Sequence, residues 1–108
     1  MTRVHIYKTE TGAYTGFLVE GHAEYADPGE DIVCSAISLL TINTVNAIGQ
    51  FTEDQTEVEE DQTKGMIRCM LQQPPSHDTE LLLRFFELGV TELAKQYKEV
   101  SCLIEQKG

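Results

Sequence analysis

The chain has 108 residues, of which 41% are hydrophobic and 24% are charged, and this suits one folded domain with a single core. Its 18 acidic and 8 basic residues give a formal net charge of -10, which argues against nucleic acid or an anionic membrane surface as partner. The same charge favours a basic partner or substrate through long-range attraction. Acidity that serves solubility alone explains the charge equally well.

Membrane insertion and export are not indicated by the sequence. No run of about eighteen apolar residues is present, so we expect no transmembrane helix. The first ten residues, MTRVHIYKTE, lack the apolar segment of a signal peptide, so we expect a cytoplasmic protein. The chain has an odd number of cysteines that lie far apart in the sequence, which predicts free thiols. They are Cys34, Cys69 and Cys102. No ligand pair has zinc-finger spacing, and we expect no metal or cofactor.

The first half of the chain predicts a hairpin and a long helix. Residues 3–9 alternate apolar and polar side chains, and residues 14–20 predict a second strand after a turn at 10–12. Residues 31–51 carry apolar side chains at three- and four-residue steps, which predicts an amphipathic helix. Its apolar face is expected to contain Val33, Ile37, Leu40, Thr44, Ala47, Ile48 and Phe51.

The second half predicts another hairpin, a second helix and a last strand. Residues 55–61 and 66–72 form the hairpin, and the acidic first strand suits an exposed sheet edge. Ser76 or Asp78 is expected to cap a helix that runs to about residue 99, and residues 100–104 predict a strand. The apolar stripe of this helix is expected to contain Leu82, Phe85, Phe86, Gly89, Val90, Leu93 and Tyr97.

Together these elements predict an α+β fold in the order ββαββαβ, with residues 1–108 as a single domain. We expect one mainly antiparallel sheet covered by two helices. Cys69 and Cys102 lie in strand patterns and are expected in the core. His5 is expected on a strand surface and His77 at the start of the second helix.

The segment GHAEYADPGEDIVCSAIS, residues 21–38, differs from the rest of the chain. If Asp31 caps the first helix, Cys34 is its third residue, where unpaired N–H groups and the helix dipole favour a thiolate. Ser38 and Thr41 follow on the same side of the helix and give Cys34 a polar neighbourhood. A thiolate at such a site is a nucleophile, although a lone cysteine is more often a small buried hydrophobe.

His22 supplies the second half of a candidate site. It follows Gly21, which has no Cβ and lets the chain turn sharply after the second strand. An imidazole near a thiol can take the thiol proton and later give it to a leaving amine. The intervening loop is long enough to bring the two side chains together, and we expect it to close over a bound peptide.

Each of these residues also has a simpler interpretation. A lone histidine at a strand end is usually a residue with ordinary structural partners, Asp31 can be only a helix cap, and Ser38 can be only a small packing residue. The acidic residues of the third strand read as a solvated edge, without the spacing of a calcium loop. These are Glu57, Glu59, Glu60 and Asp61.

The residues of this segment resemble the ribosomal-processing cysteine protease family, often called Prp. The family pattern is Gly-His-Ala, a variable loop, and Gly-x-Asp-Ile/Val-Val-Cys with a serine four residues on. Here the first part is filled by residues 21–23, and the second by Gly29 and residues 31–34 with Ser38. Ser35 stands where the pattern leads us to expect alanine, a small change in size.

The resemblance implies a cysteine endopeptidase that removes a short N-terminal extension from the large-subunit ribosomal protein numbered twenty-seven. It implies that Cys34 is the nucleophile and His22 its general base and acid, with Gly21, Asp31 and Ser38 in supporting positions. It also implies a homodimer. Ribosomal proteins are basic, which fits the acidity of this chain.

No third catalytic residue is evident, so we predict a Cys–His dyad with an oxyanion stabilised by backbone N–H groups at the start of the first helix. Two other functions compete with this one. A non-catalytic acidic module would bind a basic ribosomal protein and use Cys34 only for packing. A thiol redox enzyme would need Cys69 or Cys102 to approach Cys34 in the fold.

Overall fold

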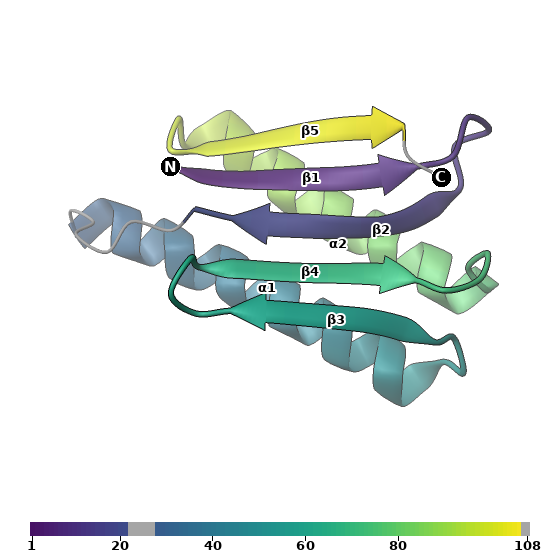
Figure 1. The fold of residues 1–108 in the computed structure, drawn as a ribbon. Coiled ribbons are helices and arrows are strands. Elements are labelled where there is room, and N and C mark those ends of the chain that lie inside the picture. Colours follow the sequence, from purple (N-terminus) through teal and green to yellow (C-terminus); the bar gives the residue numbers. More distant parts are fainter. Residues whose placement is uncertain (22–27, 107–108) are drawn as a thin grey trace.

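The computed structural model describes residues 1–21 and 28–106, without the side chains of residues 28–31. The predicted element order and the α+β class are confirmed (Figure 1). The elements in chain order are β1 (Thr2–Lys8), β2 (Tyr14–Glu20), α1 (Pro28–Phe51), β3 (Thr56–Asp61), β4 (Met66–Leu71), α2 (His77–Gln96) and β5 (Val100–Gln106).

The strands form one five-stranded sheet in the order β3-β4-β2-β1-β5. The pairs β1–β2, β2–β4 and β3–β4 are antiparallel, as the two predicted hairpins require. The pair β1–β5 is parallel, so the sheet is mixed rather than purely antiparallel. Two parallel strands must be joined by a long crossover connection. Here α2 is the last element of the connection between β1 and β5.

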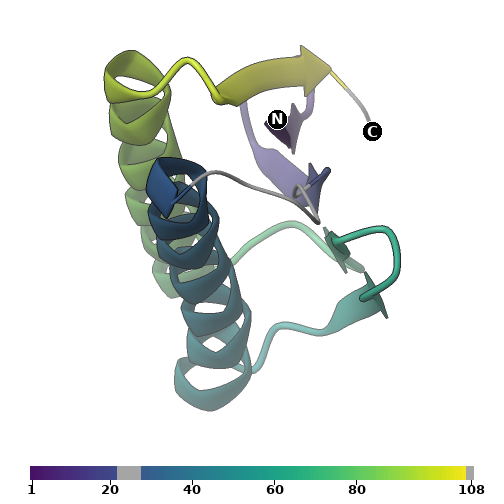
Figure 2. The ribbon, with the colours of Figure 1, turned by 90° about the vertical axis from the view of Figure 1, so that its left-hand side faces the viewer.

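Both helices lie side by side on one face of the sheet, and the other face is open (Figure 2). The core lies between the helices and the sheet. At its centre the rings of Phe17 from β2 and Phe86 from α2 stack at a centroid distance of 4.4 Å. The other buried apolar residues around them include Val4, Ile6, Val19, Val33, Ile37, Ile48, Cys69, Leu83 and Val90.

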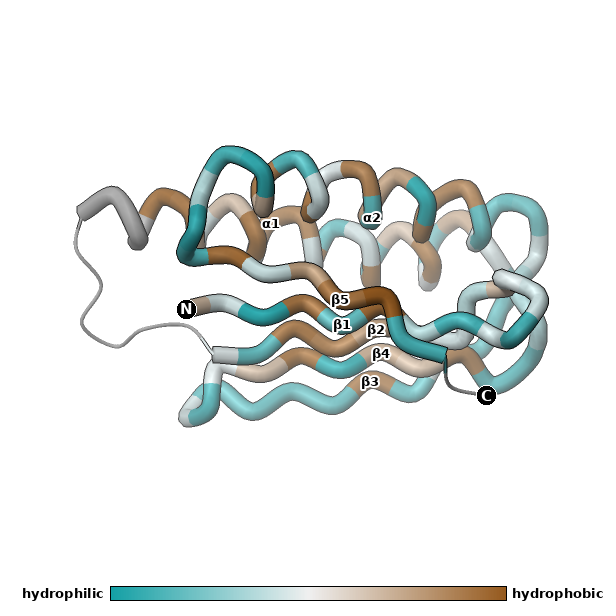
Figure 3. The backbone as a smooth tube through the Cα atoms, turned by 90° about the horizontal axis from the view of Figure 1, so that it is seen from above, coloured by the Kyte–Doolittle hydropathy of each residue, from teal (hydrophilic) through white to brown (hydrophobic). Residues whose placement is uncertain are grey.

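The edge strand β3 is hydrophilic along most of its length, whereas β1, β2 and β4 carry hydrophobic residues (Figure 3). The predicted acidic edge is therefore confirmed, because β3 is the outermost strand beside β4. Charge on an edge strand disfavours pairing with a further strand.

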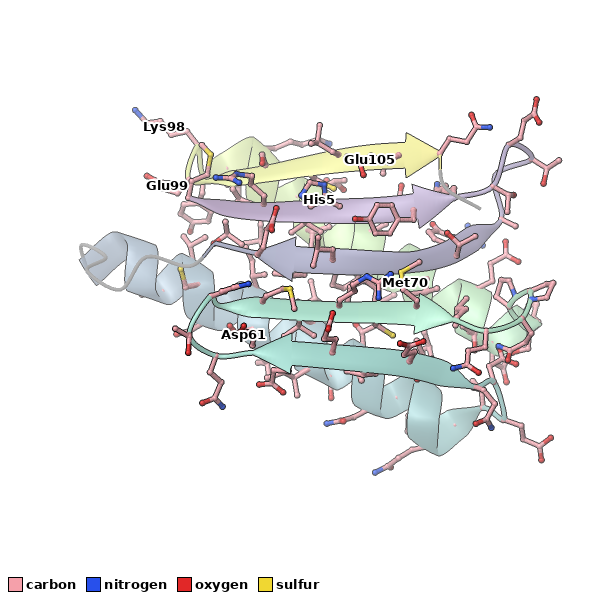
Figure 4. The ribbon with its side chains drawn as sticks, in the orientation of Figure 1. His5, Asp61, Met70, Lys98, Glu99 and Glu105 are labelled. Atoms are coloured by element: carbon pink, nitrogen blue, oxygen red, sulfur yellow. The ribbon has the colours of Figure 1, made fainter. Side chains whose placement is uncertain are left out.

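On the open face, His5 connects three strands (Figure 4). Its Nδ1 lies 3.1 Å from Oε1 of Glu105 on β5, and its Nε2 lies 3.1 Å from Oε1 of Glu20 on β2. When the imidazole is protonated, both nitrogens donate and both carboxylates are satisfied. His5 is thus on a strand surface, as predicted, and His77 is the first residue of α2.

The helix starts test the predicted caps. Ser76 is the N-cap of α2, and its side chain accepts from the Thr79 amide, so one of the two predicted caps is confirmed. The predicted cap of α1 is wrong, because α1 begins at Pro28 and Asp31 lies inside its first turn. Proline suits the first position of a helix, since its fixed φ is already helical and the missing N–H has no partner there.

Three residues of the predicted apolar faces are exposed. Phe51 is 71% exposed at the end of α1, Phe85 is 63% exposed on α2, and Tyr97 is 37% exposed at the C-cap of α2. Leu83 is buried in place of Phe85, because the α2 positions that face the sheet are Thr79, Leu83, Phe86 and Val90. Adjacent residues of a helix point about 100° apart, so Phe85 and Phe86 cannot both face the sheet.

Within the described residues, one helix passes a membrane-span criterion by length and composition, namely α1 over Ile32–Phe51. Val33, Ile37 and Ile48 of this helix are almost fully buried in the core cluster that also contains strand residues. One side of α1 therefore packs in the core, whereas Ile32, Leu39, Ile42 and Phe51 on the same helix are 47% to 71% exposed.

The adjacent phenylalanines of α2 give a matched test of the core. Phe86→Ala should lower the free energy of unfolding by about 3–5 kcal/mol, because the substitution removes a buried ring and leaves a cavity. Phe85→Ala should change it by less than about 1 kcal/mol at protein concentrations where the chain is monomeric, because that side chain is exposed in the single chain. Urea unfolding measures both, and equal losses would contradict the packing described here.

Candidate active site

Cys34 lies in the second turn of α1 and is half-buried at the edge of a pocket of about 320 Å³. The pocket is formed by α1, by the start of β1, by the end of β2 and by the β3–β4 turn. Its lining residues are Thr2, Val19, Cys34, Ile37, Ser38, Thr41, Ile42, Glu60, Asp61, Gln62, Gly65, Met66 and Ile67. The candidate nucleophile therefore opens onto a space with apolar walls and a partly acidic rim.

The predicted polar neighbourhood of Cys34 is present. Ser38 and Thr41 line the same pocket, as their spacing along the helix requires. Ser38 is exposed, whereas Thr41 is fully buried. Within the part of the chain that the structure describes, the Thr41 hydroxyl has no hydrogen-bond partner, which is unfavourable for a buried polar group.

Thr2 was not predicted as a site residue, yet its side chain contacts the candidate nucleophile. Thr2 Oγ1 lies 3.7 Å from the Cys34 sulfur, a contact between residues 32 positions apart. Thr2 is only 5% exposed and shares the inward-facing positions of β1 with Val4 and Ile6. A hydroxyl at an inward position of an alternating strand was the available signal, but nothing in the sequence showed which helix would cover it.

Gly21 has the conformation that the turn after β2 requires. Its φ is +81°, in the region that favours glycine, and a Cβ added there would lie 2.8 Å from the Met1 carbonyl oxygen. The next residue, His22, lies outside the described residues, as do residues 23–27 of the loop predicted to close over a peptide. The rest of that predicted loop, residues 28–33, is wrong as a loop because it forms the start of α1. The side chain of Asp31 is also outside the description.

The early start of α1 changes the electrostatic argument for Cys34. Counting from Pro28, Cys34 is the seventh helical residue and not the third. Unpaired N–H groups are confined to about the first four positions, and the dipole effect fades over the same turn. The helix start therefore does not explain an activated thiol at Cys34. The Cys34 amide is also not one of the unpaired N–H groups that were expected to stabilise an oxyanion.

The other two cysteines are poor nucleophiles. Cys69 is 1% exposed, and burial raises the pKa of its thiol to about 11. Burial and, to a lesser extent, the carboxylate of Glu87 raise the pKa of the Cys102 thiol. Cys69 is in the core as predicted, while Cys102 is half-buried against it. All three thiols are free, and Cys34 is the cysteine that lines the pocket.

Two acidic residues predicted as a solvated edge also belong to this pocket. Glu60 and Asp61 lie at the end of β3, and Figure 4 shows Asp61 beside the turn to β4. Asp61 Oδ1 accepts the backbone N–H of Lys64 at 3.2 Å, so this carboxylate also shapes the turn. Their negative charge makes the pocket rim unfavourable for an anionic ligand.

The fold and the pocket define an α+β protein with an accessible cysteine beside a cavity, and comparisons with known proteins identify its class. Residues 1–101 match the family model described as Cysteine protease Prp. A ribosomal processing cysteine protease Prp of Staphylococcus aureus is 25% identical over 99 residues, which are 92% of this chain and 93% of that protein.

Solved structures share the fold of this chain. The essential ribosomal processing protease Prp of S. aureus, in complex with a substrate peptide, has a TM-score of 0.87 at 23% identity and covers 99% of this chain and 100% of its own. The protein SMU.848 of Streptococcus mutans has a TM-score of 0.86 at 27% identity, over 99% of this chain and 96% of its own. The chain belongs to the Prp family of cysteine proteases.

Thr41 gives a test of the pocket interior. Thr41→Val should raise the free energy of unfolding by about 1 kcal/mol, because it removes a buried hydroxyl without a partner and keeps the shape. Thr79 is a matched control, since it is equally buried but its hydroxyl donates to Thr52 Oγ1 at 3.2 Å. Thr79→Val should lower the free energy of unfolding by about 1 kcal/mol. If both variants lose stability equally, the Thr41 hydroxyl has a partner.

Proposed function

We propose that this protease removes the short N-terminal extension of the large-subunit ribosomal protein numbered twenty-seven, with Cys34 as nucleophile and His22 as general base and acid. The observation that carries the proposal is the position of Cys34, which lines a pocket beside α1 in a chain of the Prp family. Gly21, Asp31 and Ser38 are proposed as supporting residues.

The proposed reaction is an acyl transfer to sulfur followed by hydrolysis. His22 takes the Cys34 proton, and the thiolate attacks the carbonyl carbon of the scissile bond. The tetrahedral intermediate collapses, the C–N bond breaks, and the imidazolium gives its proton to the leaving amine. Water, deprotonated by His22, then attacks the thioester and releases the new carboxylate with the free thiol.

Two observations support this assignment. Cys69 is buried and Cys102 is half-buried, both have raised thiol pKa values, and neither lines the pocket, which leaves Cys34 as the cysteine with both access and a cavity. The S. aureus protease has also been solved with a covalently linked product peptide, at a TM-score of 0.86 to this chain. Nucleophilic catalysis by a thiol passes through a covalent bond between enzyme and peptide.

The walls of the pocket fit an apolar segment of peptide. Val19, Ile37 and Ile42 come from β2 and α1, and Met66 and Ile67 close the pocket from β4. Methionine adapts its shape to different ligands because it has three rotatable bonds. Glu60 and Asp61 at the rim favour positive charge on the substrate, which agrees with a basic ribosomal protein.

We also propose that the protein acts in the cytoplasm, as its first ten residues indicate, and that it is a homodimer, as the resemblance implies. Apolar side chains at one-turn spacing on the outer side of α2 provide a surface for a second copy. They are Leu81, Phe85 and Leu88, which are 53%, 63% and 62% exposed. A mass of one 12.1 kDa chain by light scattering would overturn the dimer, and recovery in the membrane fraction would overturn the location.

Cleavage of a synthetic peptide that carries the extension of the host's own ribosomal protein tests the reaction directly. Wild type should cut once, and mass spectrometry should locate the cut. Cys34→Ala and His22→Ala should each lower the turnover rate by at least about a thousandfold, because nucleophile and base act as a unit.

Cys102→Ala is the matched control, because it removes a half-buried thiol that does not line the pocket. It should keep most of the turnover. Retained cleavage by a folded Cys34→Ala variant would overturn the assignment of the nucleophile. A folded wild type that binds the peptide without cutting it would favour another substrate for this protease.

A further inference from the structure

The start of β1 contacts both Cys34 and Gly21. Thr2 Oγ1 contacts the Cys34 sulfur at 3.7 Å, and the Met1 carbonyl oxygen packs against Gly21, the residue before His22. We propose that Thr2 is a positioning residue that holds the Cys34 sulfur and donates a hydrogen bond to its thiolate. This inference rests on the proposed role of Cys34 as nucleophile.

Thr2 is well suited to hold another side chain in place. Its amide donates to the Glu99 carbonyl at 2.8 Å, and Thr2 pairs with Val100 of β5, so β5 and the residue before it fix the backbone there. Threonine is stiff at χ1 because two heavy atoms branch from its Cβ. The side chain is 5% exposed, so solvent competes little for its hydroxyl.

The direction of the hydrogen bond depends on the state of the sulfur. While Cys34 carries its proton, either the hydroxyl or the thiol can be the donor. Once Cys34 has lost the proton, the sulfur can only accept, and the Thr2 O–H must donate. A hydrogen bond to an ionised acceptor is about twice as strong as a neutral one, so the contact favours the thiolate.

The charges at the pocket make this donor important. Among the described residues that line the pocket, the ionisable groups other than Cys34 are the carboxyls of Glu60 and Asp61. When ionised, both disfavour a negative sulfur. Cys34 is also beyond the helix start, where unpaired N–H groups would have helped. The Thr2 hydroxyl is the described side-chain group that contacts the sulfur and can oppose these effects.

The test compares Thr2→Val, which keeps the shape and removes the donor, with Thr2→Ser, which keeps the hydroxyl. The readout is the rate at which iodoacetamide alkylates Cys34, measured across a range of pH, with peptide mapping to separate Cys34 from the other thiols. Alkylation requires the thiolate but no peptide substrate. A failure of the proposed ribosomal substrate therefore cannot be mistaken for a failure of this inference.

We expect Thr2→Val to slow alkylation of Cys34 at neutral pH by about tenfold and to move the rate profile toward higher pH. Thr2→Ser should restore most of the rate at each pH. Thr44→Val is a matched control, since Thr44 is also 5% exposed on the core side of α1 but its hydroxyl donates to the Leu40 carbonyl at 2.7 Å. It should leave the profile in place.

Two outcomes would overturn the inference. An unchanged profile in a folded Thr2→Val variant would show that the hydroxyl does not support the thiolate. Equal losses of alkylation rate in Thr2→Val and Thr2→Ser, together with a lower midpoint of thermal unfolding, would show that Thr2 serves only packing. Peptide cleavage by the same variants should fall mainly in kcat, because positioning acts on the reacting sulfur rather than on peptide binding.

Discussion

The packing of α1 against the sheet determines where the functional groups of this protein lie. Val33 and Ile37 are almost fully buried against the strands, and Cys34 lies between them at the margin of the buried face. The same packing brings the sulfur to Thr2 and places Ser38 and Thr41 along one pocket. A rotation of α1 by one residue, about 100°, would move the thiol either into the core or out to solvent.

Most of the fold followed from local sequence signals. The sequence predicted the alternating strands, the amphipathic spacing of the two helices and the Ser76 cap. Each of these features depends on residues close in sequence. The parallel pairing of β1 with β5 was not, since it joins residues about a hundred positions apart. Phe85 shows the same limit, because spacing alone did not decide which of two adjacent rings faces the sheet.

The candidate site was predictable in part. The Gly-His pair and the cysteine pointed to the segment that matters, and the positive φ of Gly21 agrees with the turn expected there. The roles given to His22, Asp31 and Cys34 stay predictions. The proposed cap misplaced the start of α1 by four residues, because Pro28 and Gly29 predicted a turn although they open the helix. Thr2 could not be found, since its role depends on tertiary packing.

The most direct test of the central claim, that Cys34 at this pocket is the nucleophile, is to map the residue modified by a peptide chloromethyl ketone. The peptide would carry the ribosomal extension up to the cleavage site, so that binding brings the reactive carbon to the nucleophile. We predict one adduct per chain, on Cys34. An excess of peptide that spans the cleavage site should suppress its formation. An adduct on Cys102, or labelling of Cys34 that the peptide does not suppress, would contradict it.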